Sequence, residues 1–560
     1  MIYTQKSPAL LIIGVLMLVW GALNNAGAVD GLQAWLHPGA HKEQKQALEK
    51  HQAAEKAAAE AAAREGKPAP EAKPMKPGKF DAVKKEQAQF SYIFGGLFTV
   101  LGLAVLLLRP REGNLDYGLS VFPGIAFILL IAFVVRWGLD PMFANWGKAA
   151  EPTLGWDFAK ILNLNYVVLG IVIGIIIVNF LRIPAWAANG VRTARFFLKT
   201  GVILLGTLYS AAELAQLGAL SVVMIGVFVL GSVGLVLLMG PRMGATNSMT
   251  GVLSAGVGVC GVSAAVAVSP VVNAKAVDIA FTLGTILLWG VLCMFIFPTI
   301  GQLLGMGPVQ FGAWAGTGIL NSAQVAGAAL AFDPKGIETL KVAEIFNITR
   351  VLFLPVIVLW LAAWYVKREV GATQVNLGQV LISKFPVFVL GFILMFALSS
   401  MGLFAPAGHY QGKYFSSEQI KAENLLNDKE LAALQAVLPK ARSPQETQAL
   451  QDLIASRKAT TREQDNTLRS IAKIEGLDKA GKDALAKAHK VAWHDSRIIK
   501  AFRDWIAWLF AFGLIGLGMQ ITGKAIKQAG GKPLIIGSVV GTIKAVGSLI
   551  VVLLFVREFV

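Results

Sequence analysis

Long apolar segments recur along the whole of this 560-residue chain. A helix needs about 20 apolar residues to cross the hydrocarbon core of a bilayer, and we count about thirteen segments of that length. Hydrophobic residues make up 55% of the chain and charged residues 15%, which is typical of polytopic helical membrane proteins. We predict an all-α membrane protein with crossings at residues 8–28, 90–108, 119–137, 161–181, 199–214, 218–240, 245–273, 277–299, 311–332, 341–365, 379–403, 501–522 and 533–556.

The basic residues lie mostly in short loops between these segments. The formal net charge is +17, but it is not gathered into one patch, so no nucleic-acid partner is expected. If the N-terminus is cytoplasmic, alternate crossings place nearly all of these loops on the cytoplasmic side of the inner (plasma) membrane, as the positive-inside rule requires. The loop residues are Arg109, Arg111, Arg182, Arg192, Arg195, Lys199, Arg242, Lys367, Arg368, Lys384, Lys524, Lys527 and Lys532.

Two polar inserts interrupt the apolar sequence, and both are predicted to be extracytoplasmic. The first is rich in Ala, Lys and Glu, which favours a solvated helix, and its proline-rich end stops that helix. The second adds leucines and isoleucines three and four residues apart, which indicates a small helical bundle. Ser443, with Glu446 three residues later, is a predicted helix start. The resulting division is 1–36, 37–89, 90–160, 161–404, 405–499 and 500–560.

The first of these parts, residues 1–36, has two interpretations. It is an N-terminal transmembrane anchor, or a cleavable signal peptide, because Lys6 precedes an apolar stretch that ends near the small residues Ala26 and Ala28. Cleavage would not change the orientation of the later segments. The parts 90–160, 161–404 and 500–560 are predicted to be an additional transmembrane hairpin with its loop and the two portions of the membrane core.

Glycines interrupt the apolar segment at residues 243–272. Gly256, Gly258 and Gly261 cluster around Cys260 and Ser263. Because glycine costs about 1 kcal/mol in a helix interior, this pattern predicts a helix that breaks inside the membrane. Broken helices of this kind form solute sites in secondary transporters. Cys260 is interpreted as a small packing residue, since it and Cys293 both lie in apolar segments and the polar inserts contain no cysteine.

An internal repeat is also visible. Gly201, Gly206 and Gly218 recur with the same spacing as Gly513, Gly518 and Gly530, and a long apolar segment follows each set. The predicted topology gives the two copies opposite directions, which is the inverted arrangement of many alternating-access carriers.

Five motifs together resemble the YeiH-type, or UPF0324, membrane proteins, which are commonly described as sulfate exporters. The resemblance covers residues of about 161–403 and 500–556. It implies a fold similar to the bile-acid symporter and cation/proton antiporter group, with inverted repeats and discontinuous helices. The motifs are NYVVLGIVIGIIIVNF (165–180), GVRTARFFLKTGVILLG (190–206), GVCGVSAAVAVSPVV (258–272), FGAWAGTGILNSAQVAGAAL (311–330) and the closing pair of glycine-containing segments.

A broken helix suits an anion because its free N–H groups carry partial positive charge into a region of low dielectric. A second element, residues 316–329, carries amides and a hydroxyl, although its small residues equally favour simple helix packing. Arg350 could pair bidentately with sulfate or a carboxylate, or could pair with Glu344 instead. The predicted solute-binding residues are Gly258, Val259, Cys260, Gly261, Val262, Ser263, Asn321, Ser322, Gln324, Asn347 and Arg350.

Other ionisable residues in or near the apolar segments are given structural roles. Lys544 is predicted to lie at a helix bend near the cytoplasmic mouth, with sensing of charge in the core as the alternative. Lys275 and Asp278 are predicted to form a boundary pair, and Glu213 to be interfacial.

The chain departs from the family pattern at three places. Where members commonly have a histidine, an acidic residue and a lysine, this sequence has Leu320, Asn321 and Asn347. Because asparagine does not titrate near neutral pH, the change argues against proton coupling.

Motifs for catalysis or metal binding are missing from the sequence. It has no HExxH, GxSxG or Walker-type pattern, and His37, His41 and His51 lack acidic or cysteine partners at ligand spacing. We expect no enzyme activity, cofactor or metal. The predicted function is secondary transport, as an exporter or exchanger, of a small anion such as sulfate, a sulfonate or a carboxylate. The alternative is a membrane scaffold or sensor whose inserts bind partners. Besides lipid and solute, the inserts are expected to contact another copy of the chain or an extracytoplasmic protein.

Overall fold

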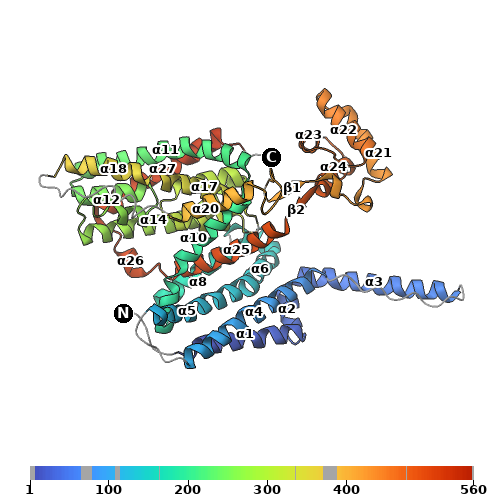
Figure 1. Cartoon of the computed structure of the whole chain (residues 1–560), viewed down its shortest axis with the longest axis horizontal. Helices are drawn as coiled ribbons and strands as arrows, with labels where there is room; N and C mark the ends of the chain where they lie inside the picture. The colour runs from blue at the N-terminus through green and yellow to red at the C-terminus, as the bar shows by residue number, and fades with distance from the viewer. Residues whose placement is uncertain are drawn as a thin grey trace. The chain divides into compact units, whose positions relative to one another are not determined.

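The computed structural model describes residues 7–64, 78–107, 114–162, 164–334, 336–369, 387–410, 412–474 and 476–557. These residues are almost entirely helical (Figure 1). The chain forms two compact units. Unit 1 comprises Met1–Lys199, Val223–Phe385 and Trp508–Val560, and unit 2 comprises Thr200–Val222 and Pro386–Ala507. The proline-rich end of the first insert and the loop residues Arg109, Arg111 and Lys384 lie outside the described residues.

Six helical runs in the described part of the chain are long and apolar enough to cross a membrane. A seventh is α1 (Ala9–Asn25) with α2 (Asp30–Leu36), if this pair, bent by 89°, counts as one span. The number is below the about thirteen crossings predicted from segment length. The six runs are Lys79–Leu107, Leu119–Leu154, Glu213–Arg242, Ala276–Leu303, Glu338–Val366 and Gly531–Phe555.

Unit 1 contains both long and short helices. In unit 1 the long ones are α3 (Pro38–Arg64), α4 (Lys79–Leu107), α5 (Asn114–Val134), α6 (Asp140–Leu154), α14 (Ala276–Leu303), α17 (Glu338–Leu352), α18 (Leu354–Val366) and α27 (Gly531–Phe555). The shorter ones are α7 (Phe158–Ile161), α8 (Tyr166–Ile176), α9 (Ala188–Val191) and α26 (Gly523–Lys527). Three helices have residues in both units: α10 (Ala194–Leu205), α11 (Ala211–Arg242) and α25 (Arg497–Gly518).

The N-terminal part of unit 1 is a closely packed helix pair, α1 with α4. A methyl group at Gly14 would lie 2.5 Å from the backbone nitrogen of Thr99, so only glycine allows the two backbones to approach this closely. The buried amides of Gln33 and Gln87 hydrogen-bond each other at 2.7 and 3.2 Å. Helix α4 begins at Lys79, within the predicted first insert, so part of that insert continues the apolar helix.

The glycine-rich predicted crossing in the middle of the chain is a helical hairpin rather than a span. Helix α12 (Asn247–Gly258) is followed by α13 (Val262–Val268), and the break falls in the glycine cluster, where it was predicted. A methyl group at Gly251 would lie 2.8 Å from the Val272 side chain. In one continuous helix these residues would be about 30 Å apart. We call residues 247–272 hairpin A; the prediction that this segment crosses the membrane was wrong.

The predicted crossing at residues 311–332 is also a hairpin. Helix α15 (Pro308–Gly318) and helix α16 (Ser322–Phe332) fold back on each other, because Phe311 near the start of the first stacks on Phe332 at the end of the second. The two ring centroids are 4.0 Å apart. We call residues 308–332 hairpin B. Its segment too was wrongly predicted to cross the membrane once.

Helix α14 packs against both hairpins. Near its start Asp278 accepts a hydrogen bond from Ser248 at the base of hairpin A. Near its end Gly301 lies against Phe311 at the base of hairpin B. Between them Gly290 touches the tip of hairpin B. The two hairpins are therefore inserted from opposite ends of α14, and their tips lie beside its middle.

The glycine repeat coincides with two helix ends. Helix α10 gives way to a 3₁₀ turn at Gly206, and α25 ends at Gly518. After each of these helix ends the chain breaks and then forms a long helix, which is α11 in the first copy and α27 in the second. At the start of α11, Glu213 and Ser210 cap each other's backbone N–H groups, which gives the predicted interfacial carboxylate a structural role.

The part of unit 2 that corresponds to the second insert is a small helical bundle. Its helices are α21 (Asp428–Val437), α22 (Pro444–Ser456), α23 (Arg462–Ile471) and α24 (Lys479–Ala492), and a two-stranded antiparallel ladder of β1 (Lys413–Phe415) and β2 (Trp493–Asp495) closes it. Elsewhere in unit 2, α20 (Val387–Ser400) packs on the 3₁₀ turn before α11, where Ser399 donates to the Thr207 carbonyl at 2.7 Å. Most residues of the predicted leucine and isoleucine face form the bundle core, with Leu426, Leu434, Leu450, Leu453, Leu468 and Ile471 buried.

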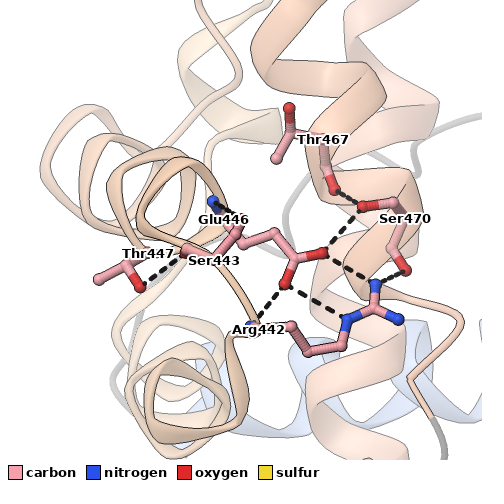
Figure 2. Close-up of polar contacts among 6 residues, drawn as sticks. All are labelled: Arg442, Ser443, Glu446, Thr447, Thr467 and Ser470. Carbon is pink, nitrogen blue, oxygen red and sulfur yellow. Dashed lines mark hydrogen bonds and ion pairs between the residues drawn. The ribbon is translucent and has the colours of Figure 1, made fainter.

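Figure 2 shows how α22 is joined to α23 in this bundle. Ser443 caps α22 by accepting from the Glu446 N–H at 3.2 Å, as predicted. The Glu446 carboxylate accepts from the Arg442 guanidinium at 2.8 Å and from the Ser470 hydroxyl at 3.3 Å. The Arg442 hydrogen bond holds the pKa of the Glu446 carboxyl below its usual range.

Candidate functional site

The tips of the two hairpins touch each other within unit 1. The Ser322 N–H points at the Cys260 carbonyl oxygen at 3.5 Å, and a methyl group at Gly261 would lie 3.0 Å from the Asn321 Cα. Gly261 has φ +78°, which side-chain-bearing residues rarely adopt. The glycine therefore serves both the sharp turn and the close contact between tips.

A buried lysine binds the end of the first arm of hairpin A. Lys544, on α27, is 1% exposed, and its ammonium donates to the carbonyl oxygens of Val257 and Gly258, both at 3.0 Å. These carbonyls end α12 and have no partner within the helix. The C-terminal end of a helix carries partial negative charge, which the lysine offsets.

A buried arginine does the same for hairpin B. Arg350, on α17, has no exposed surface, and its guanidinium donates to the carbonyl oxygen of Ile319, the residue that follows α15. It also donates to the Asn347 side-chain oxygen at 2.9 Å and approaches the Ser322 hydroxyl at 3.5 Å. Both negative helix ends at the tips are thus bound by a cation.

The positive ends of the second arms receive no such cap. The residues in the N-cap position, Gly261 before α13 and Asn321 before α16, make no side-chain cap hydrogen bond. Helix α13 has only 7 residues, so its dipole is weak, whereas α16 has 11. Of the two uncapped helix starts, that of α16 therefore has the larger dipole, and it lies beside Ser322 and Arg350.

Two buried polar atoms in the described residues near these tips have no hydrogen-bond partner. They are Nε of Arg350 and Oε1 of Gln324. The Gln324 amide nitrogen donates to the Leu287 carbonyl at 3.3 Å, and Gly290 makes room for its oxygen, since a methyl group there would lie 1.8 Å away. An unsatisfied buried polar atom costs about 1–3 kcal/mol, so both atoms favour the approach of a polar solute.

Access to the tips is uneven. Ser263 is exposed on the surface of unit 1, and Val262 and Ser322 are half-buried. In contrast, Val259 and Cys260 at the first-arm side are buried. The accessible side of the tips is thus the side on which α13 and α16 begin.

The eleven predicted binding residues all lie at the two tips or on α17 beside them. Two ionisable residues had other predictions. Lys544, predicted at a helix bend near a mouth, binds the middle of the site, and its place within an apolar segment is the signal that identifies it. Asp278, predicted to pair with Lys275, instead accepts from the hydroxyls of Ser248 and Thr246.

Glu344 reaches Arg350 indirectly. Its carboxylate accepts from the Asn347 side-chain nitrogen at 3.0 Å, and the same amide accepts from Arg350. The sequence analysis offered a direct Arg350–Glu344 pair as the alternative to solute binding. The structure places Asn347 between the two, an arrangement that the spacing of the residues along the sequence does not reveal.

Comparison with known proteins places the chain among membrane proteins. A family model described as "Conserved hypothetical protein 698" matches residues 123–421. A UPF0324 membrane protein of Nitratidesulfovibrio vulgaris is 35% identical over 447 residues, which cover 79% of this chain and 96% of the relative. Another from the same organism is 38% identical, with 55% and 84% covered, and one from Pseudomonas aeruginosa is 30% identical, with 44% and 70% covered. No solved structure matches the chain.

Proposed function

Because the chain belongs to the UPF0324 membrane protein family, we propose that it is a secondary transporter that moves a small anion by alternating access, without ATP. The observation that carries this proposal is the pairing of the hairpin tips. Cations bind the carbonyl ends of the first arms, while the starts of the second arms have no side-chain cap and two buried polar atoms beside them have no partner.

The electrostatics of the tips favour an anion. With Lys544 and Arg350 bound to the negative helix ends, the positive end of α16 is not offset by a side chain. A guanidinium presents two parallel donors, which match two oxygens of sulfate, a sulfonate or a carboxylate. We place the solute between Ser322, Gln324 and Arg350, with Ser263 at the entrance.

The hairpins also provide a way to alternate access. We infer that hairpin A enters from the cytoplasmic side, next to the basic loop with Arg242, and hairpin B from the opposite side. A hairpin returns the chain to the side from which it entered. Hairpin A therefore reverses the direction of α14 relative to the prediction, and hairpin B restores the predicted orientation of every later helix. The basic loops therefore stay cytoplasmic and both inserts extracytoplasmic in the plasma membrane. The tip of hairpin A then lies between the solute and the cytoplasm, and the tip of hairpin B between the solute and the opposite side of the membrane.

The proposal is tested by thermal stabilisation of the purified full chain with sulfate, methanesulfonate and succinate. A ligand at a hundred times its Kd stabilises by about 2.7 kcal/mol. We expect at least one anion to raise the melting temperature and Arg350→Gln to remove the effect. Arg442→Gln, which changes a guanidinium of the insert, is the matched control and should keep it. No shift with any of the three anions would contradict the proposal.

A scaffold or sensor function is the second candidate, because the insert has a hydrophobic core of its own. This function predicts that the protein carries no anion flux into proteoliposomes. It also predicts that deletion of residues 405–499 abolishes partner binding. Flux that persists without the insert would contradict this second function. Enzymatic activity is not part of either proposal.

A further inference from the structure

A line of polar residues winds around α17 from its start to the hairpin tips. The residues are spaced three apart, which keeps neighbours on the same side of a helix. All but the first are buried, with Lys341 and Glu344 each 1% exposed. The members are Glu338, Lys341, Glu344, Asn347 and Arg350.

The inner half of this line is continuous. Arg350 donates to Asn347 at 2.9 Å, and Asn347 donates to the Glu344 carboxylate at 3.0 Å. At the outer half the Lys341 ammonium lies 3.7 Å from Glu338, whose side chain is 27% exposed. A buried carboxylate is therefore linked through one amide to the guanidinium that we place at the solute.

The elements packed against α17 bring few charges to Glu344. Helices α15 and α16 contain no ionisable side chain. Asp333 follows α16 and is 3.5 Å from the Thr339 hydroxyl, and Tyr365 is the ionisable side chain of α18. Among the described residues, the charged group that acts on Glu344 is thus Arg350, on its own helix, through Asn347.

We propose that Glu344 is the proton-binding group that couples proton movement to anion movement, an inference that rests on the proposed function. With the site empty, Glu344 is a carboxylate whose charge is balanced through Asn347 by Arg350. A bound anion takes over that guanidinium. The carboxylate is then buried beside a second negative charge, and both effects favour its neutral form.

The proton balance of this step is simple. A proton from bulk water binds a Glu344 carboxylate oxygen when the anion arrives, and it returns to water when the anion leaves. One proton thus accompanies each anion. By linkage, lower pH strengthens anion binding to the same extent that the anion strengthens proton binding. Glu344 supplies the titratable group that Leu320, Asn321 and Asn347 lack.

The experiment is calorimetric titration of the full-length protein with sulfate and with methanesulfonate, in pairs of buffers that differ in ionisation enthalpy. Both probes stay fully ionised between pH 5 and 9, so any proton taken up binds the protein. We expect uptake that approaches one proton per anion, and a Kd that rises up to about tenfold per pH unit where Glu344 ionises.

Glu344→Gln should abolish both the uptake and the pH dependence, while it keeps the tight binding that the parent protein shows at low pH. Asp278→Asn, a change at another buried carboxylate of unit 1, is the matched control and should keep both. Proton uptake by the parent protein needs no variant, so the test stands even if Glu344→Gln fails to fold.

Two results would overturn the inference: anion binding without proton uptake, or uptake that persists in Glu344→Gln. A different result, no binding of either anion at any pH, would refute the proposed function itself. The two failures are therefore distinguishable in one experiment.

Discussion

The hairpin tips and the insert bundle both bury charged side chains, but they use them differently. In the bundle Asp465, which has no exposed surface, accepts from His489 at 3.0 Å and from Trp493 at 2.5 Å, and the Glu446 carboxylate accepts from the Arg442 backbone and guanidinium and from the Ser470 hydroxyl. Among the described residues from 412 to 499, no buried side-chain polar atom lacks a hydrogen-bond partner. At the tips, in contrast, Arg350 and Gln324 each keep one unsatisfied buried atom.

The difference indicates what each region is built for. Saturated hydrogen bonding stabilises one conformation, and it suits a module that must fold around a small core. Unsatisfied buried atoms lower stability, so their presence at the tips is explained when a ligand satisfies them. Matched substitutions in the two regions test this reading.

The largest effect is expected from the two buried or half-buried lysines. Lys544→Met leaves the Val257 and Gly258 carbonyls without a donor and should cost about 2–4 kcal/mol of unfolding free energy. Lys487→Met in the bundle removes a partly exposed pair with Glu430, at 2.7 Å, and should cost about 1 kcal/mol or less. Melting temperatures of the full chain measure both. Equal losses of unfolding free energy in the two variants would contradict the difference that we draw between the tips and the bundle.

Glycine substitutions give the next largest difference. Gly261 and Gly476 have nearly the same φ, +78° and +79°, but nothing lies within 4 Å of a methyl group at Gly476. Gly476→Ala should therefore cost about 1 kcal/mol from backbone strain alone, and Gly261→Ala about 2–3 kcal/mol, because the methyl also presses on Asn321. Thermal unfolding measures the costs. Only Gly261→Ala should weaken stabilisation by anions, and an unchanged anion effect would argue against the tips as the site.

Two glutamines sharpen the contrast between stability and binding. Gln464 in the bundle is fully bonded, to the Thr460 N–H at 2.7 Å and the Ala449 carbonyl at 3.2 Å, so Gln464→Leu should destabilise by about 1–2 kcal/mol. Gln324→Leu removes an unsatisfied oxygen and should leave the melting temperature unchanged or raised, while it weakens anion binding. A loss of stability without a loss of binding in Gln324→Leu would reverse our assignment.

The smallest effect concerns pH in the bundle. Since the pKa of Glu446 is lowered in the folded state, its contribution is present above the unfolded-state value of about 4.3 and is lost as pH falls through the folded-state value. Glu446→Gln should therefore destabilise α22 by about 1 kcal/mol at pH 7 and by less in acid. Hydrogen exchange of α22, corrected for intrinsic rates, measures this. Glu423→Gln, in an exposed pair 3.9 Å long, is the control and should change nothing.

Local features of the fold could be read from the sequence. The glycine cluster predicted the break at the tip of hairpin A, and the serine cap of α22 lies where its spacing indicated. The fold-back of the hairpins could not be read in this way. Apolarity and length are the same for a crossing helix and for two packed arms, so residues 245–273 and 311–332 were both assigned as crossings.

The candidate site shows the same limit. The tip of hairpin A was selected because its glycines predict a helix break, and Asn321, Gln324 and Arg350 because polar groups are expensive in apolar segments. The same rule singled out Lys544, but it did not indicate what the lysine contacts. Lys544 binds carbonyls 286 and 287 residues away, a relation that no local pattern contains.

By itself the sequence determined a helical membrane protein of the UPF0324 family, the position of the break at the tip of hairpin A and the serine cap of α22. These depend on hydrophobic transfer and on hydrogen bonds within a few residues of each other. Only the tertiary structure decided that the breaks are hairpin tips, that they meet, and that Lys544 and Arg350 bind their carbonyl ends. Those features depend on contacts between segments hundreds of residues apart, where close packing and charge neutralisation select one arrangement among many that the same local sequence allows.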